Sequence, residues 1–268
     1  MSLSRPLLIT LSALALGTVA VPAAPLAAEP AAPTLIGAAG THEVERRVGP
    51  ARRWDRWQRT GRGTAGSSSF RFDTLIDGRP VRMDPCAPIR WSSSTARGPV
   101  GGVAVLKEAV ARVAAVSGTT WTYVGPTAAE PGTRLLPRAP AASYPPVVLG
   151  WSDASRSDLL ARTQPSTLGV TQTQWFGMAY ADGTRRAKAV GAVVALDRTE
   201  RLPLRGGLSW KTVALHELGH AMGLDHVEDN SQLMDTGLSR TLTDLQAGDR
   251  NGLIRAGRAG GCVRVPGI

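Results

Sequence analysis

Three of the chain's four histidines lie close together, and their spacing constrains the local fold more than any other feature of the sequence. Residues 216 to 226 read His-Glu-Leu-Gly-His-Ala-Met-Gly-Leu-Asp-His. Side chains four residues apart share one face of a helix, so we expect His216 and His220 to lie side by side. Gly223 can adopt the positive φ that ends a helix, and the resulting turn would bring His226 back toward the other two.

This arrangement favours a single metal ion with an open coordination position. Three neutral imidazoles leave the fourth position of a tetrahedral zinc for water, which is typical of a catalytic site. Glu217 follows the first histidine and can take a proton from that water and pass it to a leaving amine. We therefore expect one Zn²⁺ bound by His216, His220 and His226, with Glu217 as the general base of peptide-bond hydrolysis.

Composition excludes several other classes of protein. A chain of 268 residues with 43% hydrophobic positions can build a real core, as one large domain or two small ones. Away from the N-terminus no apolar run approaches the roughly 18 residues of a membrane span. Two cysteines cannot supply a four-thiolate zinc module. The net charge of +10 would suit a nucleic-acid binder, but charge alone carries no mechanism, so we expect no nucleic-acid partner.

The N-terminus has the pattern of a secretory signal peptide over residues 1–28. Arg5 precedes an apolar run that ends at Pro22 and leads into small residues. The alternative, an uncleaved anchor, is disfavoured because the run is short for a bilayer. Export predicts a secreted, extracellular protein without stable membrane insertion after signal cleavage. An oxidising environment would allow a disulfide between Cys86 and Cys262, while the alternative is a Cys86 thiolate that caps the metal.

Residues 29–80 are rich in alanine, proline and arginine and have little periodicity. Three interpretations remain open for this basic segment: a solvated linker, a pro-segment removed on activation, or an arm that binds an anionic surface. His42, the remaining histidine, is expected to be solvated.

From residue 81 to residue 268 the pattern indicates one α/β (α+β) domain with helices on a twisted mixed sheet. Apolar residues at helical spacing predict a helix that ends near Ser117 and Gly118, and Ser209 is the expected N-cap of the histidine-bearing helix. Alternating or buried apolar runs predict strands over 88–91, 119–124, 147–151, 177–181 and 189–196.

The run from His216 to His226 resembles the His-Glu-x-x-His-x-x-Gly-x-x-His signature of the metzincins, which are zinc endopeptidases. It is most similar to the matrixins, which include secreted bacterial members. The resemblance implies a five-stranded mixed sheet, a backing helix, an active-site helix and a C-terminal helix. It also implies a methionine turn at Met234 and a monomer acting on protein or peptide substrates. Substrate would pair with an edge strand formed by Gly177, Met178, Ala179, Tyr180 and Ala181.

Some positions depart from the matrixin pattern. Val227 stands where matrixins usually have serine, and Met234 is followed by Asp235 and Thr236 rather than a Tyr-Pro-like pair. No histidine lies between Arg47 and Leu215, so the second, structural zinc of vertebrate matrixins is not expected. Calcium is conceivable but unsupported, because the scattered acids Asp153, Asp158 and Asp182 are usually solvated.

A binding protein is the rival interpretation from another class. It would keep the fold, lack catalysis, and act through the basic N-terminal arm on an anionic surface. The intact Glu217 argues against it, because a binding module has no need of that carboxylate.

Overall fold

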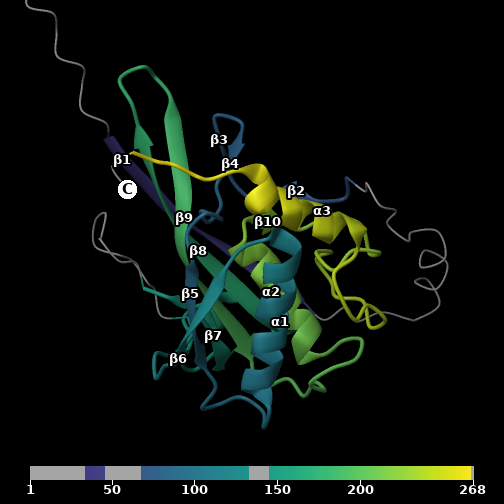
Figure 1. Cartoon of the computed structure of the whole chain (residues 1–268). Coiled ribbons are helices and arrows are strands. Elements are labelled where there is room, and N and C mark those ends of the chain that lie inside the picture. Colours follow the sequence, from purple (N-terminus) through teal and green to yellow (C-terminus); the bar gives the residue numbers. More distant parts are fainter. Residues whose placement is uncertain (1–33, 46–67, 133–144, 267–268) are drawn as a thin grey trace, which may run out of the picture. The chain divides into compact units, whose positions relative to one another are not determined.

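The computed structural model describes residues 34–45, 68–132 and 145–266, of which residues 34–45 are described by their backbone alone. The described residues belong to one unit, Ala32–Ile268. The expected signal peptide and the arginine-rich part of the basic segment lie outside the described residues. The strands and helices (Figure 1) are β1 (Thr34–Glu45), β2 (Arg71–Phe72), β3 (Leu75–Ile76), β4 (Arg79–Pro80), β5 (Ile89–Ser94), α1 (Gly102–Ser117), β6 (Trp121–Pro126), β7 (Val147–Ser152), β8 (Thr167–Ala179), β9 (Arg185–Asp197), α2 (Trp210–Ala221), β10 (Leu224–Asp225) and α3 (Ala247–Ala256).

One mixed sheet forms the centre of this unit, with strand order β1-β8-β9-β7-β5-β6. Strands β6, β5, β7 and β9 run parallel, and β8 lies antiparallel to β9. These five strands, together with three helices, confirm the predicted mixed α/β fold. A sixth strand, β1, adds antiparallel to β8 over its whole length and comes from the segment 29–80 for which no strand was expected.

The residues just before Val81, in the segment whose role the sequence left open, also form short strands. Strands β3 and β4 form a short hairpin over Leu75–Pro80, and β2 pairs with β10 directly after the histidine-bearing helix. The same segment also packs closely against α3. Phe70 lies so near Gly252 that a Cβ on this glycine would overlap it. Chain that was expected to precede the domain therefore supports β10, the strand that ends just before His226.

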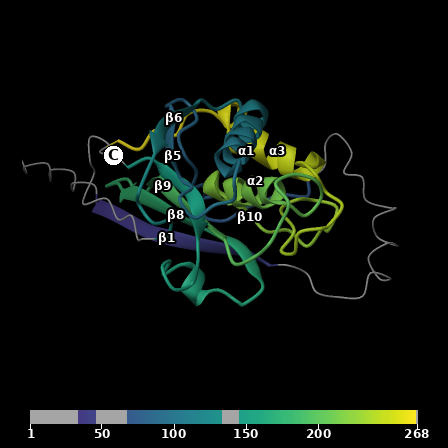
Figure 2. The same ribbon diagram turned by 90° about the horizontal axis from the view of Figure 1, so that it is seen from below.

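The three helices cover one face of the sheet, which Figure 2 shows edge-on. The two faces can be told apart along β8, because successive side chains of a strand point to opposite faces of the sheet. Val170 packs with Leu159 and Leu160 in a small cluster on the far face. Its neighbours Gly169 and Thr171 face α2 instead. The histidine-bearing helix therefore lies directly beneath β8, and both helix and strand are buried there.

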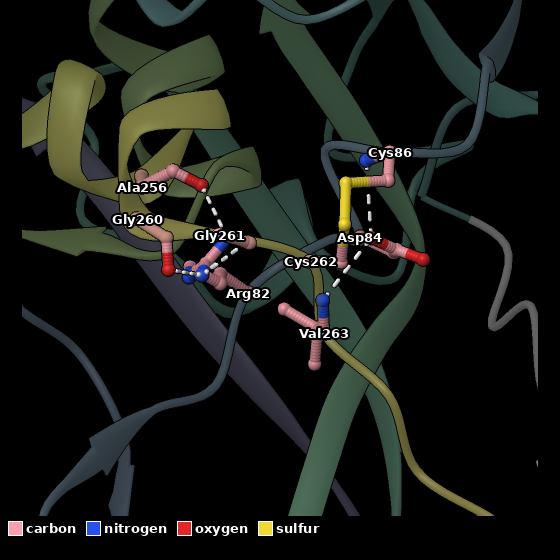
Figure 3. The surroundings of a disulfide bond; sticks show 8 residues. All are labelled: Arg82, Asp84, Cys86, Ala256, Gly260, Gly261, Cys262 and Val263. Carbon is pink, nitrogen blue, oxygen red and sulfur yellow. Dashed lines mark hydrogen bonds between the residues drawn. A yellow bond between two sulfur atoms is a disulfide. The ribbon is translucent and has the colours of Figure 1, made fainter.

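Cys86 and Cys262 form a disulfide, with their Cα atoms 5.3 Å apart and a sequence separation of 176. Figure 3 shows how it joins the segment before β5 to the C-terminal tail. The carboxylate of Asp84 accepts hydrogen bonds from the backbone N–H groups of Cys86 and Val263, which fixes both segments beside the bridge.

No helix in the described part of the chain is long and apolar enough to cross a membrane.

Candidate metal centre

Helix α2 begins where its capping signal predicts. The side chain of Ser209 accepts a hydrogen bond from the backbone N–H of Thr212, and the Thr212 hydroxyl accepts one from the backbone N–H of Ser209. This reciprocal arrangement satisfies two backbone donors that a helix N-terminus leaves without partners. The cap fixes the start of the helix, and hence which face of α2 carries His216 and His220.

The end of α2 depends on Gly223. Its φ is +95°, a conformation that side chains with a Cβ disfavour. A Cβ at this position would also lie only 2.7 Å from the carbonyl oxygen of Val81. The sharp turn leads into β10, which carries the chain back to His226.

The three histidines converge on one point, as the spacing predicts. The Nε2 atoms of His216 and His220 lie 3.0 Å apart, and that of His226 lies 3.1 and 3.2 Å from them respectively. His216 and His220 are buried, whereas His226 is partly exposed. The cluster therefore has one side toward solvent from which water and a substrate can enter.

Hydrogen bonds determine which ring nitrogens face the common point. The Nδ1 of His216 donates to the Leu233 carbonyl at 2.6 Å, and the Nδ1 of His220 donates to the Leu224 carbonyl at 2.8 Å. A carbonyl can only accept, so both Nδ1 atoms carry the proton and both Nε2 lone pairs point inward.

Such lone pairs repel one another unless a cation lies between them. Donors at 2.0 to 2.1 Å from a tetrahedral zinc are about 3.3 Å apart, close to the separations found here. The donor set and its spacing therefore fit zinc, and the three residues form one of two groups in the described chain that could hold a metal ion. The other group contains Cys86 and Cys262, whose sulfur atoms are bonded to each other.

Glu217, which directly follows His216 in α2, is completely buried. Its Oε2 accepts a hydrogen bond of 2.6 Å from the hydroxyl of Thr171 in β8. A Cβ on Gly169 would lie 3.0 Å from Glu217 Oε1, so this part of β8 is tightly packed against the carboxylate. The strand thus orients Glu217, and sequence reasoning missed Thr171 because no local pattern links it to α2.

Met234 lies under the histidines and packs against α2. A Cβ on Gly219, between the two helical histidines, would overlap the Met234 sulfur. The turn that carries Met234 is held by Asp249 of α3, whose carboxylate accepts hydrogen bonds from the N–H groups of Leu233 and Met234. Burial raises the pKa of Asp249 above the usual carboxyl range, although the backbone N–H donors act in the opposite direction.

Asp249 is a second residue whose role the sequence did not reveal. The Leu233 N–H that it holds belongs to the same residue whose carbonyl fixes the His216 ring. The Asp249 carboxylate thus holds the methionine turn directly. Through Leu233 it also holds the residue whose carbonyl accepts the hydrogen bond from His216. Of this arrangement, the sequence predicted only that a C-terminal helix exists.

The residues expected to form the substrate edge lie at the end of β8 and in the turn after it. Gly177, Met178 and Ala179 form the last part of β8, paired with β9 on one side and β1 on the other, while Tyr180 and Ala181 belong to the following turn. These residues therefore have no open edge beside them. The part of β8 that lies against Glu217 is eight to ten residues earlier, at Gly169 and Thr171.

Two further expectations concern calcium and a cysteine ligand to the metal. The Asp153 carboxylate is engaged by Ser155 and Arg198, and that of Asp182 accepts hydrogen bonds from Thr184. Neither is arranged as an oxygen ligand for calcium, which has no support in the described residues. A Cys86 thiolate on the metal, the alternative left open by the sequence, is wrong because Cys86 is oxidised to the disulfide.

Comparison with known proteins supports this assignment of the site. The family model described as matrixin matches residues 153–255. This range includes β8, β9, α2 and most of α3, together with all three histidines, Glu217 and Met234. No curated protein matches the chain.

Proposed function

From the premise that residues 153–255 form a matrixin-like segment of a zinc metallopeptidase, we propose that this chain is a secreted zinc-dependent endopeptidase. The observation that carries the proposal is the convergence of three Nε2 atoms within 3.2 Å of one another, beside the buried carboxylate of Glu217. A structural zinc site would need a fourth protein ligand, whereas three ligands and an adjacent carboxylate are the composition of a hydrolytic site.

In this proposal His216, His220 and His226 hold the zinc ion. Zinc supplies Lewis acidity when bound, which lowers the pKa of water and polarises a carbonyl. The protein's own contribution is to fix the three rings before the metal arrives. The carbonyls of Leu233 and Leu224 do this for two of the rings, because their hydrogen bonds select the tautomer whose Nε2 is free to coordinate.

Glu217 is the proposed general base. Its carboxylate takes the proton of the attacking water and delivers it to the amine that leaves when the peptide bond breaks. The Thr171 hydroxyl donates to Oε2 and so restricts rotation of the carboxyl group. Thr171 acts through Glu217 and is therefore a positioning residue.

Secretion belongs to the same proposal. A disulfide between distant segments is typical of proteins that fold in an oxidising compartment, and residues 1–28 have the pattern of a signal peptide. N-terminal sequencing of exported material tests both the cleavage after the signal and the fate of residues 29–80. An N-terminus still at Met1 would contradict this part.

The decisive experiment measures cleavage of a denatured protein by wild type and by Glu217→Ala, each with and without a chelator. We expect cleavage by wild type alone, and only without chelator, while the variant still binds about one zinc per chain. Glu228→Ala is the matched control, because it removes an exposed acid from the turn near His226. If the Glu217 variant cleaves as fast as wild type, or if wild type cleaves nothing, the proposal is wrong and the binding-protein alternative is favoured.

A further inference from the structure

The strand that lies over Glu217 is already paired on both sides. β1 runs antiparallel to β8, in register from Thr34 opposite Ala179 to Glu45 opposite Thr167. Figure 1 shows β1 along the outside of the sheet, where β8 would otherwise be the edge. Peptides that bind a protease by strand addition need such an edge, because their main chain supplies the hydrogen bonds that give affinity.

The register shows which part of β1 lies nearest the site. Gly169 and Thr171 are the β8 residues in contact with Glu217. Their partners on β1 are Val44 and His42, respectively. The segment from residue 41 to residue 45 is therefore the part of the N-terminal chain that passes the candidate metal centre.

We propose that residues 34–45 occupy the position of the substrate main chain on β8 and must be displaced before a protein substrate can bind. This inference rests on the proposed endopeptidase function. The occupant is thus a named segment of the same chain, and the partner that replaces it is an extended peptide.

The composition of the two strands favours reversible pairing. Gly37, Ala38, Ala39 and Gly40 stand in the middle of β1, and such small residues contribute little to strand stability beyond main-chain hydrogen bonds. In contrast, β8 is rich in Thr, Gln and aromatic residues and has no charged residue. A peptide with larger side chains can therefore gain packing that β1 does not supply.

The connection to the domain keeps this competitor close. β1 ends at Glu45, and the described chain resumes at Ser68, where the Ser69 hydroxyl donates to the Asp229 carboxylate at 2.6 Å. A tether of this length gives the segment an effective concentration of roughly millimolar. The tethered segment therefore competes with a free substrate as if it were present at that concentration, which raises the substrate concentration needed to occupy β8.

The test uses the full chain with Thr41→Pro and His42→Pro together. Successive N–H groups of a strand point to opposite sides, so one of two adjacent prolines removes a hydrogen bond to β8. The matched control, Thr41→Val with His42→Val, keeps both N–H groups and strand propensity. A fluorescent peptide with the sequence of residues 34–45 reports on the edge through its anisotropy, with or without zinc.

We expect the peptide to bind the proline variant at least about tenfold more tightly than wild type or the valine control. Cleavage of a peptide substrate should rise in the same variant and fall again when the unlabelled peptide is added. Equal peptide binding by all three proteins would overturn the inference whatever their activity. If the peptide binds as expected but no variant cleaves, the occupied edge stands and the endopeptidase function fails.

A separate observation concerns a cavity of about 580 Å³ between the β3–β4 hairpin, the start of β9 and the C-terminal tail. Its lining includes five arginines and no acidic residue: Arg79, Arg82, Arg186, Arg255 and Arg264. Arg82 is the fixed member, with only 5% of its surface exposed. Its guanidinium donates to the carbonyls of Ala256, Gly260 and Gly261, which Figure 3 shows beside the disulfide.

Carboxylates outside the lining interact with two of these arginines, Asp77 with Arg79 and Asp182 with Arg186. Arg255 stacks on Phe70 and Arg186 lies over Tyr180, so both guanidinium groups rest on rings. Asp84 lies close enough to interact with Arg82, but its oxygen accepts the N–H groups of Cys86 and Val263. The geometry points to a binding site for a tetrahedral oxyanion, such as a sulfate or phosphate group, which guanidinium groups bind through paired hydrogen bonds.

Titration calorimetry with inorganic sulfate and with phosphate, against chloride at equal ionic strength, tests this site. Arg79→Gln with Arg264→Gln should weaken binding at least about tenfold, as expected for the loss of charged hydrogen bonds. Arg162→Gln with Arg201→Gln removes two exposed arginines elsewhere and should change nothing. The site is refuted if titration with sulfate and phosphate releases no more heat than titration with chloride. It is also refuted if both double variants lose the same amount of anion affinity. Binding of one anion alone would identify which ester group the cavity accepts.

Discussion

At the scale of single residues, the hydroxyl that holds Glu217 comes from a strand 46 residues earlier in the chain. Thr171→Val removes this donor and keeps the shape of the side chain. A hydrogen bond to a charged group contributes about 1.5 to 3 kcal/mol, so we expect kcat to fall roughly ten- to hundredfold. Zinc content should stay the same, because the three histidines keep their partners.

Thr173→Val serves as the control for this substitution. It removes another buried hydroxyl two residues further along β8. If both variants lose the same activity, the effect is on the strand and Thr171 has no special role toward Glu217. A shift in the acidic limb of the kcat profile in Thr171→Val alone would show that the hydroxyl acts through the carboxylate.

Asp153 makes stability depend on pH. Hydrogen bonds from Ser155 and then Arg198 lower its pKa from 3.8 to about 2. A carboxyl with a lowered folded-state pKa stabilises the protein fully above its unfolded-state value and loses that contribution as pH falls toward the folded-state value. Asp153→Asn should therefore be less stable than wild type at pH 7, with a difference that shrinks from about pH 4 to about pH 2. Urea unfolding at several pH values measures this, and a constant difference would contradict it.

Residues adjacent in sequence could be predicted, whereas those from distant elements could not. The positions of His216, Glu217 and His220 follow from helical periodicity, and Gly223 indicates the turn. Thr171 and Asp249 have no such local signal, because each acts on α2 or its turn only after the sheet and the last helix have packed.

At the scale of elements, the disulfide joins the chain before β5 to the tail after α3. Closing a loop of this length contributes up to about 5 kcal/mol in the chain-entropy model. Cys86→Ser with Cys262→Ser should therefore lower the thermal midpoint by several degrees and leave bound zinc unchanged. Metal analysis of the double variant checks the second part, and loss of zinc in the folded variant would show that the bridge also supports the site.

Helices were easier to predict than strand boundaries. Ser209 and Gly223 bracket α2 in the sequence as they do in the structure, since capping groups and positive φ act locally. β8 was expected over five residues and spans Thr167–Ala179 instead. In its earlier part, side chains point alternately toward α2 on one face and toward Leu159 and Leu160 on the other. Because both faces are buried, the strand lacks the usual alternation of polar and apolar residues.

At the scale of the whole molecule, the candidate metal centre connects α2, β10 and the turn that carries Met234. A ligand that binds only the folded state stabilises it by about 4 kcal/mol when its concentration is 1,000 times its Kd. A chelator should therefore lower the thermal midpoint, and one equivalent of zinc should restore it. Magnesium at the same concentration is the control, because imidazole ligands do not suit it. No change on chelation would contradict a zinc site.

The fold class could be predicted because the order of strands and helices indicates a mixed sheet with helices on it. The sixth strand could not, because residues 37–40 have neither alternation nor β-branched side chains. A strand of this kind forms only where another strand already offers its hydrogen-bonding groups. β1 therefore depends on its pairing with β8, which its own sequence does not reveal.

The place of β1 on the sheet has a practical consequence for anyone who produces this protein. Expression of a shortened chain that starts near Ser68 would leave the thirteen residues of β8 as an uncovered edge without a charge. Long, neutral, exposed edges pair with one another and lead to aggregation. A shortened chain with a lysine in place of Gln172 would tell whether precipitation comes from that edge, because a single edge charge suppresses such pairing.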